Sequence, residues 1–287
     1  MKLSENHKTI VAEIEHKLAR ELYFDPSLPQ AKVLDAMRYA TLGGGKRLRG
    51  TLTVLSGDFC GVNREKSIAL AAAIECMHAY SLVHDDLPAM DNSATRRGQP
   101  SVHRAFGEAT AILAGDGLQA LAFELAADAN LSADGIKAFA SAVGRFGMVG
   151  GQMHDMLAEV GEIIPSKASL EQLHLGKTGE LIIFAACAGV YQSGLEAHKV
   201  SLTVYGKRLG LAFQIWDDVL DVIGDEEKTG KPTSQDQNKM TFTSLLGLEN
   251  SIVEAQRLIK EAKEALPIND FTKPLFEIAD FAIDRTS

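Results

Sequence analysis

The sequence predicts an all-α fold. The chain has only 8 prolines, and these are clustered, so long stretches remain free to form helix. Long segments rich in Ala, Leu, Ile and Met recur, whereas strand-like alternation bounded by turns is scarce. No Pro- or Ser-rich linker and no shift in composition divides the chain, so we expect residues 1–287 to form a single domain.

The expected helices are the long apolar segments that contain no proline. They are residues 66–84, 109–129, 136–148, 181–192 and 200–222. The longest apolar run, residues 181–191, is too short to cross a bilayer. The first twenty or so residues are polar and periodic, without the apolar core of a signal peptide. We therefore expect a cytoplasmic protein without stable membrane insertion.

Composition narrows the class of function. Apolar residues make up 46% and charged residues 23%, which is ordinary for a globular protein and excludes a disordered scaffold. The 38 acidic residues exceed the 29 Lys and Arg, and the net charge of -9 disfavours nucleic-acid binding. Three cysteines without a CxxC pair (Cys60, Cys76 and Cys187) predict buried free thiols in a reducing compartment.

An acidic cluster follows the apolar segment that ends near residue 216. It consists of Asp217, Asp218 and Asp221 in QIWDDVLDVIGD. At 100° per residue, Asp217 and Asp221 lie about 40° apart on one helix face, and Asp218 lies beside them. Like charges at this spacing repel unless a cation joins them. Carboxylate oxygens suit Mg²⁺, which takes one or two of them and keeps water or phosphate oxygens.

Another acidic cluster lies earlier in the chain, in VHDDLPAMDN, and consists of Asp85, Asp86 and Asp91. In chain order, this is the first acidic motif, and the cluster at residues 217–221 is the second. Asp85 and Asp91 are about 120° out of phase on an ideal helix. Pro88 cannot continue helical hydrogen bonding, so we expect the chain to distort there and to return Asp91 towards Asp85. One such triplet alone is typical of a solvated helix face. Two triplets at the ends of apolar helices, together with the basic motifs, favour metal ligation.

Basic residues accompany the acidic clusters. They are Lys46, Arg47 and Arg49 in GGGKRLRG, Arg96 and Arg97 in TRRGQPSVH, Lys177 beside Thr178 in HLGKTGEL, and Lys231 and Lys239. GGGKRLRG is not a Walker A loop, and alone it is either a basic turn or a phosphate contact. Glycines allow a ligand to approach the backbone closely, and Lys and Arg supply charge-assisted hydrogen bonds to phosphate. A diphosphate with Mg²⁺ satisfies both sets of charges.

These motifs, in this order, resemble the trans-isoprenyl diphosphate synthases, and among them the bacterial-type farnesyl diphosphate synthases. The matching segments are GGGKRLRG, DDLPAMD, TRRGQPSVH, AILAGDGLQALAFE, MVGGQMHDM, LGKTGELI, FQIWDDVLDVIGD and KPTSQDQNKMTFTSLLG. The resemblance runs from about residue 30 to the C-terminus. It implies an isoprenoid-synthase-like helical bundle around a deep central cavity, in a homodimer that acts on isoprenoid diphosphates.

The resemblance also implies roles for individual residues. Mg²⁺, with three ions when substrate is bound and Mn²⁺ as a possible substitute, would be held by Asp85, Asp91, Asp217 and Asp221, assisted by Asp86 and Asp218. The allylic diphosphate would be held by Arg96, Lys177, Lys231 and Lys239. Isopentenyl diphosphate would be held by Lys46, Arg49, His78 and Arg97, with backbone contacts from Gly45. The cationic intermediate would be stabilised by Thr178 and Gln214.

Two residues upstream of Asp85 bear on these roles. His78 lies seven residues before Asp85 and about 20° away on the helix, so it shares the face of that carboxylate. Tyr80, followed by the small Ser81, lies five residues before Asp85. An aromatic residue here, with the longer first motif, resembles the subgroup that makes a fifteen-carbon product. Core packing is the alternative interpretation of Tyr80, and geranyl or geranylgeranyl diphosphate remain alternative products.

The sequence departs from the family pattern at three places. Gly50 stands where Pro is usual, Ser234 where Gly is common, and the tail AIDRTS has only Arg285 as a basic residue, so closure of a basic tail over the site is not predicted. Three rivals stay open: an HD-type metal phosphohydrolase, suggested by His84-Asp85, a catalytically silent partner subunit, and a terpene cyclase. For His84 we expect a structural role.

Overall fold

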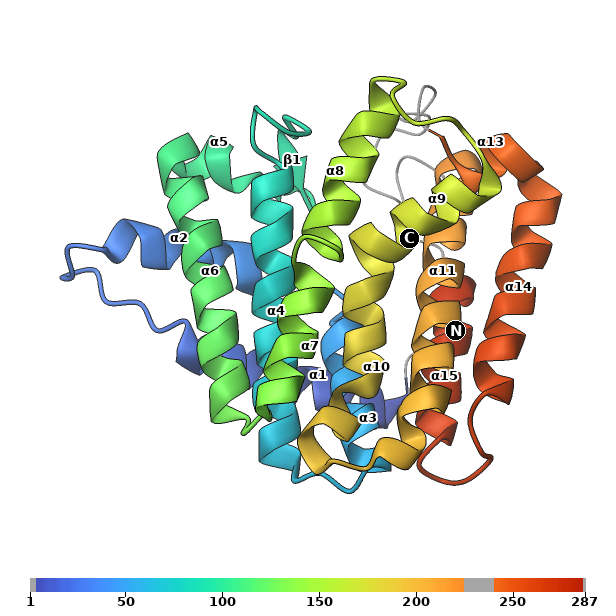
Figure 1. Cartoon of the computed structure of the whole chain (residues 1–287). Helices are drawn as coiled ribbons and strands as arrows, with labels where there is room; N and C mark the ends of the chain where they lie inside the picture. Colours follow the sequence, from blue (N-terminus) through green and yellow to red (C-terminus); the bar gives the residue numbers. More distant parts are fainter. Residues whose placement is uncertain (1–3, 225–239, 286–287) are drawn as a thin grey trace. The chain divides into compact units, whose positions relative to one another are not determined.

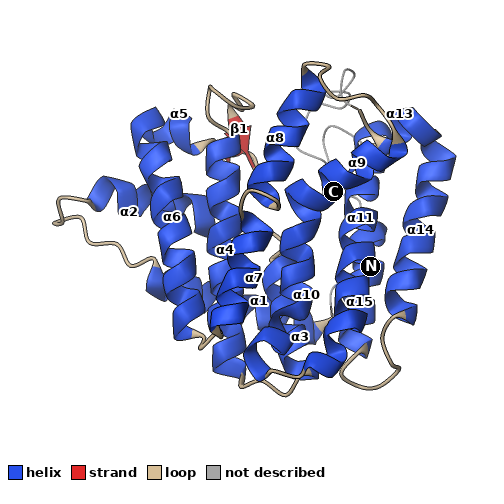
Figure 2. Ribbon diagram, in the orientation of Figure 1, coloured by secondary structure: helices blue, strands red, loops and turns tan. Residues whose placement is uncertain are grey.

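The computed structural model of the chain describes residues 4–224 and 240–285, and helices dominate it (Figure 1, Figure 2). The α-helices are α1 (Glu5–Glu21), α2 (Ala31–Leu42), α3 (Leu48–Phe59), α4 (Arg64–Asp85), α5 (Val102–Phe106), α6 (Glu108–Asp128), α7 (Ala133–Val143), α8 (Met148–Glu159), α9 (Lys167–His174), α10 (Glu180–Ser193), α11 (Lys199–Ile223), α13 (Phe242–Leu246), α14 (Leu248–Glu264) and α15 (Lys273–Asp284). A π-helical turn (Leu175–Gly179) joins α9 to α10, and a 3₁₀ turn (Glu196–His198) precedes α11. In the described ranges, the strands are β1 (Thr95–Arg96) and β2 (Gln99–Pro100), which form one antiparallel hairpin. The predicted all-α class is confirmed.

Contacts between Cα atoms divide the chain into two compact units. The N-terminal unit contains Ser4–Val54 and Asn63–Leu131, and the C-terminal unit contains Leu55–Val62 and Ser132–Ser287. Helix α3 contributes its first residues to one unit and its last residues to the other. Each unit carries one of the two acidic motifs. The single-domain organisation stays a prediction.

Helix α4 is the central helix of the N-terminal unit, where α1, α2 and α6 pack against it. Every residue from Ser67 to Met77 is buried, as expected for a helix that is apolar on all sides. The N-cap of the helix is Asn63, whose side chain accepts hydrogen bonds from the first-turn backbone N–H groups. It ends at Asp85, before Pro88. The helices predicted at 66–84 and 109–129 are confirmed as α4 and α6.

The C-terminal unit is built on α10 and α11, which pack against each other, and α7 and α14 pack on them. Gly189 of α10 lies so close to Ser56 that a Cβ atom would come within 2.1 Å of the Ser56 carbonyl oxygen. The hydroxyl of Ser56 donates to the Ala186 carbonyl at 2.5 Å and accepts from the Gly189 N–H at 3.0 Å. The helices predicted at 181–192 and 200–222 are confirmed as α10 and α11.

One helical run, Lys167–Ser193, is long and apolar enough to cross a membrane by length and composition alone. This run joins α9, the π-helical turn and α10, so it is longer than the apolar stretch recognised in the sequence. Of its most apolar window, 67% is buried inside the protein, which is also typical of a core helix. The test is therefore weak support for a membrane span.

The helix predicted over residues 136–148 is wrong in its second half. Helix α7 ends at Val143, and a new helix, α8, begins at Met148. Gly144 has an extended backbone with ψ of -152°, and Gly147 has a ψ of -127°, which is outside the helical region. A Cβ atom on Gly147 would come within 2.0 Å of the Ala142 carbonyl oxygen. Two glycines therefore break an otherwise apolar stretch that reads as one helix.

The cysteines behave as predicted. Cys60, Cys76 and Cys187 are all buried free thiols. Burial raises the pKa of Cys60 to about 11 and that of Cys76 to about 12, so neither thiol ionises near neutral pH.

Candidate active site

The first acidic motif is formed by the end of α4 and the turn that follows it. The Asp91 N–H donates to the Asp85 carbonyl oxygen at 2.9 Å, which closes the turn around Pro88. The Asn92 N–H donates to the Leu87 carbonyl at 3.0 Å, and Asn92 has a left-handed φ of 48°. The expected distortion at Pro88 is confirmed, since the backbone of Asp91 returns to that of Asp85.

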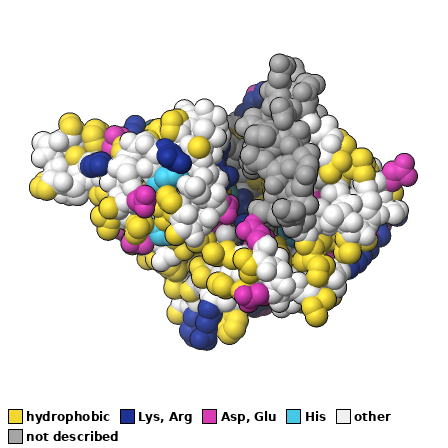
Figure 3. Space-filling view, turned by 90° about the horizontal axis from the view of Figure 1, so that it is seen from above, with side chains coloured by type: hydrophobic (Ala, Val, Ile, Leu, Met, Phe, Trp, Pro, Cys, Tyr) yellow, Lys and Arg dark blue, Asp and Glu magenta, His cyan; other side chains and the backbone are white. Residues whose placement is uncertain are grey.

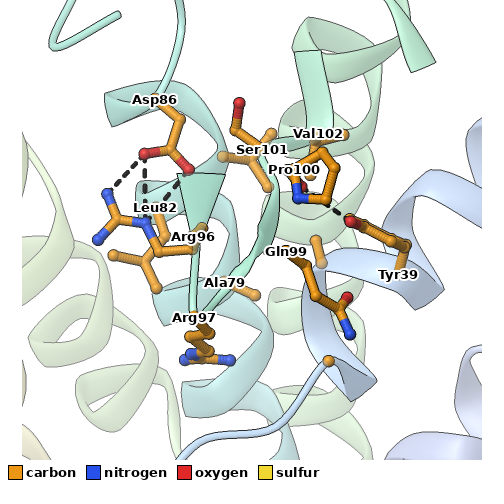
Figure 4. A pocket seen from close by; sticks show the side chains of 13 residues that line it. Tyr39, Ala79, Leu82, Asp86, Arg96, Arg97, Gln99, Pro100, Ser101 and Val102 are labelled. Carbon is orange, nitrogen blue, oxygen red and sulfur yellow. Dashed lines mark hydrogen bonds and ion pairs between the residues drawn. The ribbon is translucent and has the colours of Figure 1, made fainter. Parts of the chain in front are cut away.

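Asp86, between these two acids, has a different environment. Its side chain is 2% exposed and accepts from the Arg96 guanidinium, with an Nη2–Oδ1 distance of 2.5 Å and Nε contacts of 3.2 Å. Arg96 lies on β1, so this bidentate pair fastens the hairpin to the end of α4 (Figure 4). The carboxylate of Asp86 is thus engaged within the chain, which fits an assisting role better than a ligand role.

The glycine-rich loop before α3 lies against Arg97. Gly44 and Gly45 have φ values of 97° and 133°, which residues with a side chain rarely adopt. The Arg97 guanidinium donates to the Gly44 carbonyl, and a Cβ atom on Gly45 would come within 3.0 Å of that guanidinium. The glycines therefore allow an arginine from the hairpin to approach the loop backbone.

His78 lies beside Arg49. Its Nε2 is 3.5 Å from Nη1 of Arg49. Burial, and then the charges of Arg49, Arg97, Arg47 and Arg96, hold the pKa of His78 well below its usual value. The imidazole is therefore neutral. Arg47 and Arg96 are paired with carboxylates in this structure, whereas Arg97 contacts the Gly44 carbonyl and Arg49 lies beside the imidazole. Arg49 and Arg97 are therefore the arginines of this group that suit an anionic ligand such as a diphosphate.

Arg47 has a role that the sequence did not reveal. The sequence grouped it with its basic neighbours Lys46 and Arg49, but its side chain is 1% exposed and faces the interior. It pairs with Glu15 at 2.6 Å and Glu75 at 3.3 Å. Glu75 also accepts the Gly50 N–H at 2.8 Å. Proline, the usual residue of the family at this position, has no N–H and could not donate this hydrogen bond. Gly50 can donate it to the buried Glu75 carboxylate.

A pocket lies between the hairpin, α2 and α4 (Figure 4). Its apolar wall includes Ala79, Leu82 and Val102, and Arg96 and Arg97 stand at its side. The Tyr39 hydroxyl donates to the Pro100 carbonyl at 2.8 Å and so fixes α2 to β2. In the view from above, basic side chains form small separate groups with acidic side chains among them (Figure 3).

The second acidic motif lies near the end of α11. This helix runs unbroken from Lys199 to Ile223, so Asp217 and Asp221 share one face as predicted. Asp217 accepts from Nε2 of Gln214 at 3.1 Å. Asp218 is 13% exposed and accepts the Phe242 N–H at 2.7 Å, at the start of α13. Asp218 therefore holds α13 in place, which is compatible with an assisting role.

Gln214 links the second acidic motif to the π-helical turn. Its Oε1 accepts from the Thr178 hydroxyl at 3.1 Å and lies 3.3 Å from Nδ1 of His174. Burial lowers the pKa of His174 to about 4, so this ring is neutral. Because the Gln214 amide already donates to Asp217, its orientation is fixed by hydrogen bonds on both sides.

Lys177 also lies on the π-helical turn. Its Nζ is 2.6 Å from Oδ2 of Asp155 on α8. A Cβ atom on Gly151 would come within 2.0 Å of the Lys177 backbone nitrogen, so glycine lets α8 contact this turn directly. Asp155 and His174 were not singled out in the sequence. The glycine pair at 150–151, one turn before Asp155, is the sequence feature that could have indicated a close contact of this helix with another element.

Arg285 reaches the second acidic motif from the end of the chain. Its side chain is 6% exposed, and its Nη1 lies 2.7 Å from Oδ1 of Asp217. The same guanidinium donates to the Phe213 and Ala282 carbonyls and lies 3.9 Å from the centre of the Phe213 ring. The Trp216 indole donates to the Arg285 carbonyl at 3.2 Å. The single tail arginine is thus docked in this structure.

The donor set fits Mg²⁺. Asp85 and Asp91 in one unit, and Asp217 and Asp221 in the other, supply only carboxylate oxygens. Mg²⁺ prefers such hard oxygen ligands, and it usually completes one or two protein carboxylates with water and phosphate oxygens. Within residues 4–224 and 240–285, no group of three or more His, Cys, Asp or Glu side chains is placed to hold a metal ion by itself. Lys231 and Lys239 lie outside the described residues.

Comparisons with known proteins identify the family. Residues 30–270 match the family model described as polyprenyl synthetase. Farnesyl diphosphate synthase of Escherichia coli K12 is 44% identical over 88% of this chain and 89% of its own. Geranylgeranyl diphosphate synthase of Cyanophora paradoxa is 39% identical over 99% of both chains.

Solved structures give the same result. An FPP/GFPP synthase from Zymomonas mobilis superposes with a TM-score of 0.86 and 38% identity, covering 96% of this chain and 97% of its own. A Helicobacter pylori geranyltransferase, solved with magnesium and isoprenyl diphosphate, superposes with a TM-score of 0.79 and 34% identity, covering 99% and 97%. The chain therefore belongs to the polyprenyl synthetase family.

Proposed function

We propose that the protein is a farnesyl diphosphate synthase, which joins isopentenyl diphosphate head-to-tail to dimethylallyl or geranyl diphosphate and releases pyrophosphate. Farnesyl diphosphate synthases at 42–44% identity support this activity. The observation that carries the proposal is the pair of arginines, Arg49 beside the neutral His78 and Arg97 against the glycine-rich loop. A prenyltransferase binds a second anionic substrate, and these two arginines suit its diphosphate.

The reaction needs no protein nucleophile. The C–O bond of the allylic diphosphate breaks, and pyrophosphate leaves with the electron pair. The double bond of isopentenyl diphosphate attacks the allylic cation, a new C–C bond forms, and a proton is lost to the departing pyrophosphate. Bound Mg²⁺ supplies Lewis-acid neutralisation of the leaving group, and Asp85, Asp91, Asp217 and Asp221 would hold it.

The other residues orient the substrates and exclude water, which would quench the cation. Lys46, Arg49 and Arg97 bind isopentenyl diphosphate, and neutral His78 adds a hydrogen bond without adding charge. Arg96 and Lys177 serve the allylic diphosphate, together with Lys231 and Lys239. The oriented oxygens of Thr178 and Gln214 stabilise the cation, as electrostatic preorganisation requires. Gly45 lets the loop backbone approach the substrate.

Product length separates the proposal from its nearest rival. A relative named as a geranylgeranyl diphosphate synthase matches 99% of the chain, so a twenty-carbon product is the second candidate. Tyr80 and Ser81, placed upstream of Asp85, favour the fifteen-carbon product. An HD-type phosphohydrolase is disfavoured because residues 30–270 match the polyprenyl synthetase model and the relatives are prenyl diphosphate synthases.

The remaining parts of the proposal follow the resemblance. They are three Mg²⁺ ions with substrate bound, Mn²⁺ as a substitute, a homodimer, a single domain, a cytoplasmic location, and no stable membrane insertion. Manganese titration monitored by electron paramagnetic resonance counts the ions, and analytical ultracentrifugation gives the oligomeric state.

The decisive experiment incubates the purified protein with Mg²⁺ and the two five-carbon diphosphates, singly and together. We expect pyrophosphate only when both are present, and farnesol as the main alcohol after dephosphorylation and chromatography. Phosphate released from one substrate alone would instead identify a hydrolase. A cyclic hydrocarbon from added farnesyl diphosphate would identify a terpene cyclase, and no product from either mixture would identify a silent subunit.

A further inference from the structure

The glycine-rich loop (residues 43–47) is held at both ends by buried groups. Arg47, its last residue, has a left-handed φ of 48°, which is uncommon for a residue with a side chain. The Nη2 of Arg47 donates to the Thr41 carbonyl oxygen at 2.6 Å, in the last turn of α2. The Arg47 carbonyl oxygen accepts the Thr51 N–H at 2.8 Å, in the first turn of α3. Arg47 therefore joins the end of α2 to the start of α3.

Glu75 of α4 completes this arrangement. Its side chain is 3% exposed, and its two oxygens have different partners. The Oε2 atom pairs with Nη1 of Arg47 at 3.3 Å, and the Oε1 atom accepts the Gly50 N–H at 2.8 Å. A carboxylate this deeply buried needs a partner charge and hydrogen bonds, and these two residues supply them. A residue with left-handed φ persists where its surroundings fix it, and these contacts fix Arg47.

The two held positions each follow a residue that we assign to isopentenyl diphosphate. Lys46 directly precedes Arg47, and Arg49 directly precedes Gly50. Because the next backbone unit is held in each case, the two cationic side chains start from fixed points. The side chains of Arg47 and Glu75 are 1% and 3% exposed, so they act through these neighbours and do not touch the substrate.

We propose that Arg47 and Glu75 are positioning residues that hold the glycine-rich loop in the geometry that binds isopentenyl diphosphate. The inference rests on the proposed function, in which Lys46 and Arg49 bind that substrate. The loop contains glycines with positive φ, and glycine loses more conformational freedom on ordering than any other residue. A loop that is ordered before the substrate arrives avoids this entropy loss at binding, and the affinity rises without a new contact.

The test compares Glu75→Gln with Glu65→Gln, which is the same change at an exposed position of α4. Glu75→Gln keeps an acceptor for the Gly50 N–H but removes the charge that pairs with Arg47. Isothermal titration calorimetry with isopentenyl diphosphate and a chelator reports on the basic site, because the aspartates repel a diphosphate when Mg²⁺ is absent. We expect the Kd to rise about ten- to a hundredfold, the factor for losing one hydrogen bond to a charged group. Glu65→Gln should bind as the wild type does.

Steady-state kinetics separates positioning from loss of fold. For Glu75→Gln we expect the KM for isopentenyl diphosphate to rise, while the KM for the allylic diphosphate stays near the wild-type value. A purely structural defect would lower kcat, because fewer molecules are folded, and would leave both KM values unchanged. Equal rises in the two KM values, or an unchanged Kd in the folded variant, would overturn the positioning role.

The double variant Arg47→Met with Glu75→Leu keeps the test decisive if Glu75→Gln fails to fold. It leaves neither member of the pair as an unpartnered buried charge, so we expect circular dichroism to show intact helices. Neither the Thr41 carbonyl nor the Gly50 N–H retains its side-chain partner, so the Kd should rise at least as far. A folded double variant with wild-type affinity would overturn the proposal.

Hydrogen exchange of the wild-type chain tests the order of the loop without any substitution. We expect the amides of residues 43–50 to be protected before isopentenyl diphosphate is added and to gain little protection afterwards. Protection that appears only with the ligand would show that the loop is not held in advance, and the proposal would be wrong.

The two levels of proposal fail in different ways. If the wild-type protein binds isopentenyl diphosphate but releases no pyrophosphate from the paired substrates, the proposed function is wrong. If the wild-type protein turns over and the variants bind isopentenyl diphosphate normally, the function stands and the positioning role is wrong.

Discussion

The two acidic motifs differ in which carboxylate the chain itself neutralises. In the first motif, Arg96 pairs with the middle acid, Asp86, which is 2% exposed. In the second motif, Arg285 pairs with Asp217, a proposed metal ligand that is 44% exposed. The first arrangement resembles a fixed structural pair, whereas the second places a protein cation on an acid that we propose as a metal ligand. Both motifs therefore consist of three aspartates, but they differ in which of these carboxylates pairs with an arginine of the chain.

The largest expected effect is the loss of turnover when a ligand is removed from either motif. We expect Asp85→Ala and Asp217→Ala each to lower kcat by about a thousandfold or more, because Lewis-acid stabilisation is worth several kcal/mol. Circular dichroism should show intact helices in both variants. Steady-state pyrophosphate release is the measurement, and near-normal turnover in either variant would contradict the metal role of that motif.

The buried pair of the first motif should matter chiefly for stability. Asp86→Ala leaves the partly buried Arg96 guanidinium without its partner, which should lower the free energy of unfolding by about 2–4 kcal/mol. Urea denaturation measures this change. Asp134→Ala, in a largely exposed ion pair with Lys137, is a suitable control and should change little. Equal losses for the two variants would show that the Asp86 pair is not a structural pair.

Acid should weaken the surroundings of the second motif through His174. Its pKa is about 4 in the folded protein, against an ordinary value of 6.5, because burial disfavours the charged ring. Its contribution to stability is fully present above pH 6.5 and is lost as the pH falls towards 4. The loss reaches about 2–3 kcal/mol. Urea denaturation between pH 7 and pH 4 measures it, and His174→Gln should have a flatter profile. Parallel profiles would refute this linkage.

The smallest expected effect concerns the tail. Arg285→Ala removes a buried guanidinium, yet the remaining Asp217 is partly solvated, so we expect a loss of about 1–2 kcal/mol. Thermal melting measures it, with the exposed Arg104→Ala as control. A loss as large as that of Asp86→Ala would remove the contrast between the two motifs.

Several features were predictable because they depend on local rules. The apolar segments without proline became α4 and α11, and the i,i+4 spacing placed Asp217 and Asp221 on one face. Pro88 predicted the turn that returns Asp91 to Asp85, because a missing N–H ends a helix wherever it occurs. The family resemblance rested on such local motifs, which explains its agreement with the comparisons.

Other features depend on partners far away in the sequence. Nothing near Arg47 shows that it is buried, since Glu15 and Glu75 lie 32 and 28 residues away. The pairing of Asp155 with Lys177 depends on the packing of α8 against the π-helical turn, which the sequence does not show. The break between α7 and α8 needed the backbone angles of two glycines, which composition does not specify. Side-chain pairing across elements is thus what the linear pattern leaves open.

The buried charge of Arg47 has a consequence for anyone who shortens this protein. The family match begins at residue 30, but Glu15, which balances Arg47 beside the glycine-rich loop, belongs to helix α1. Removal of residues 1–29 would leave the buried Arg47 guanidinium without Glu15, next to the glycine-rich loop that we propose to bind a diphosphate. An expression design that discards this leading helix as dispensable would thereby loosen the substrate loop it was meant to preserve.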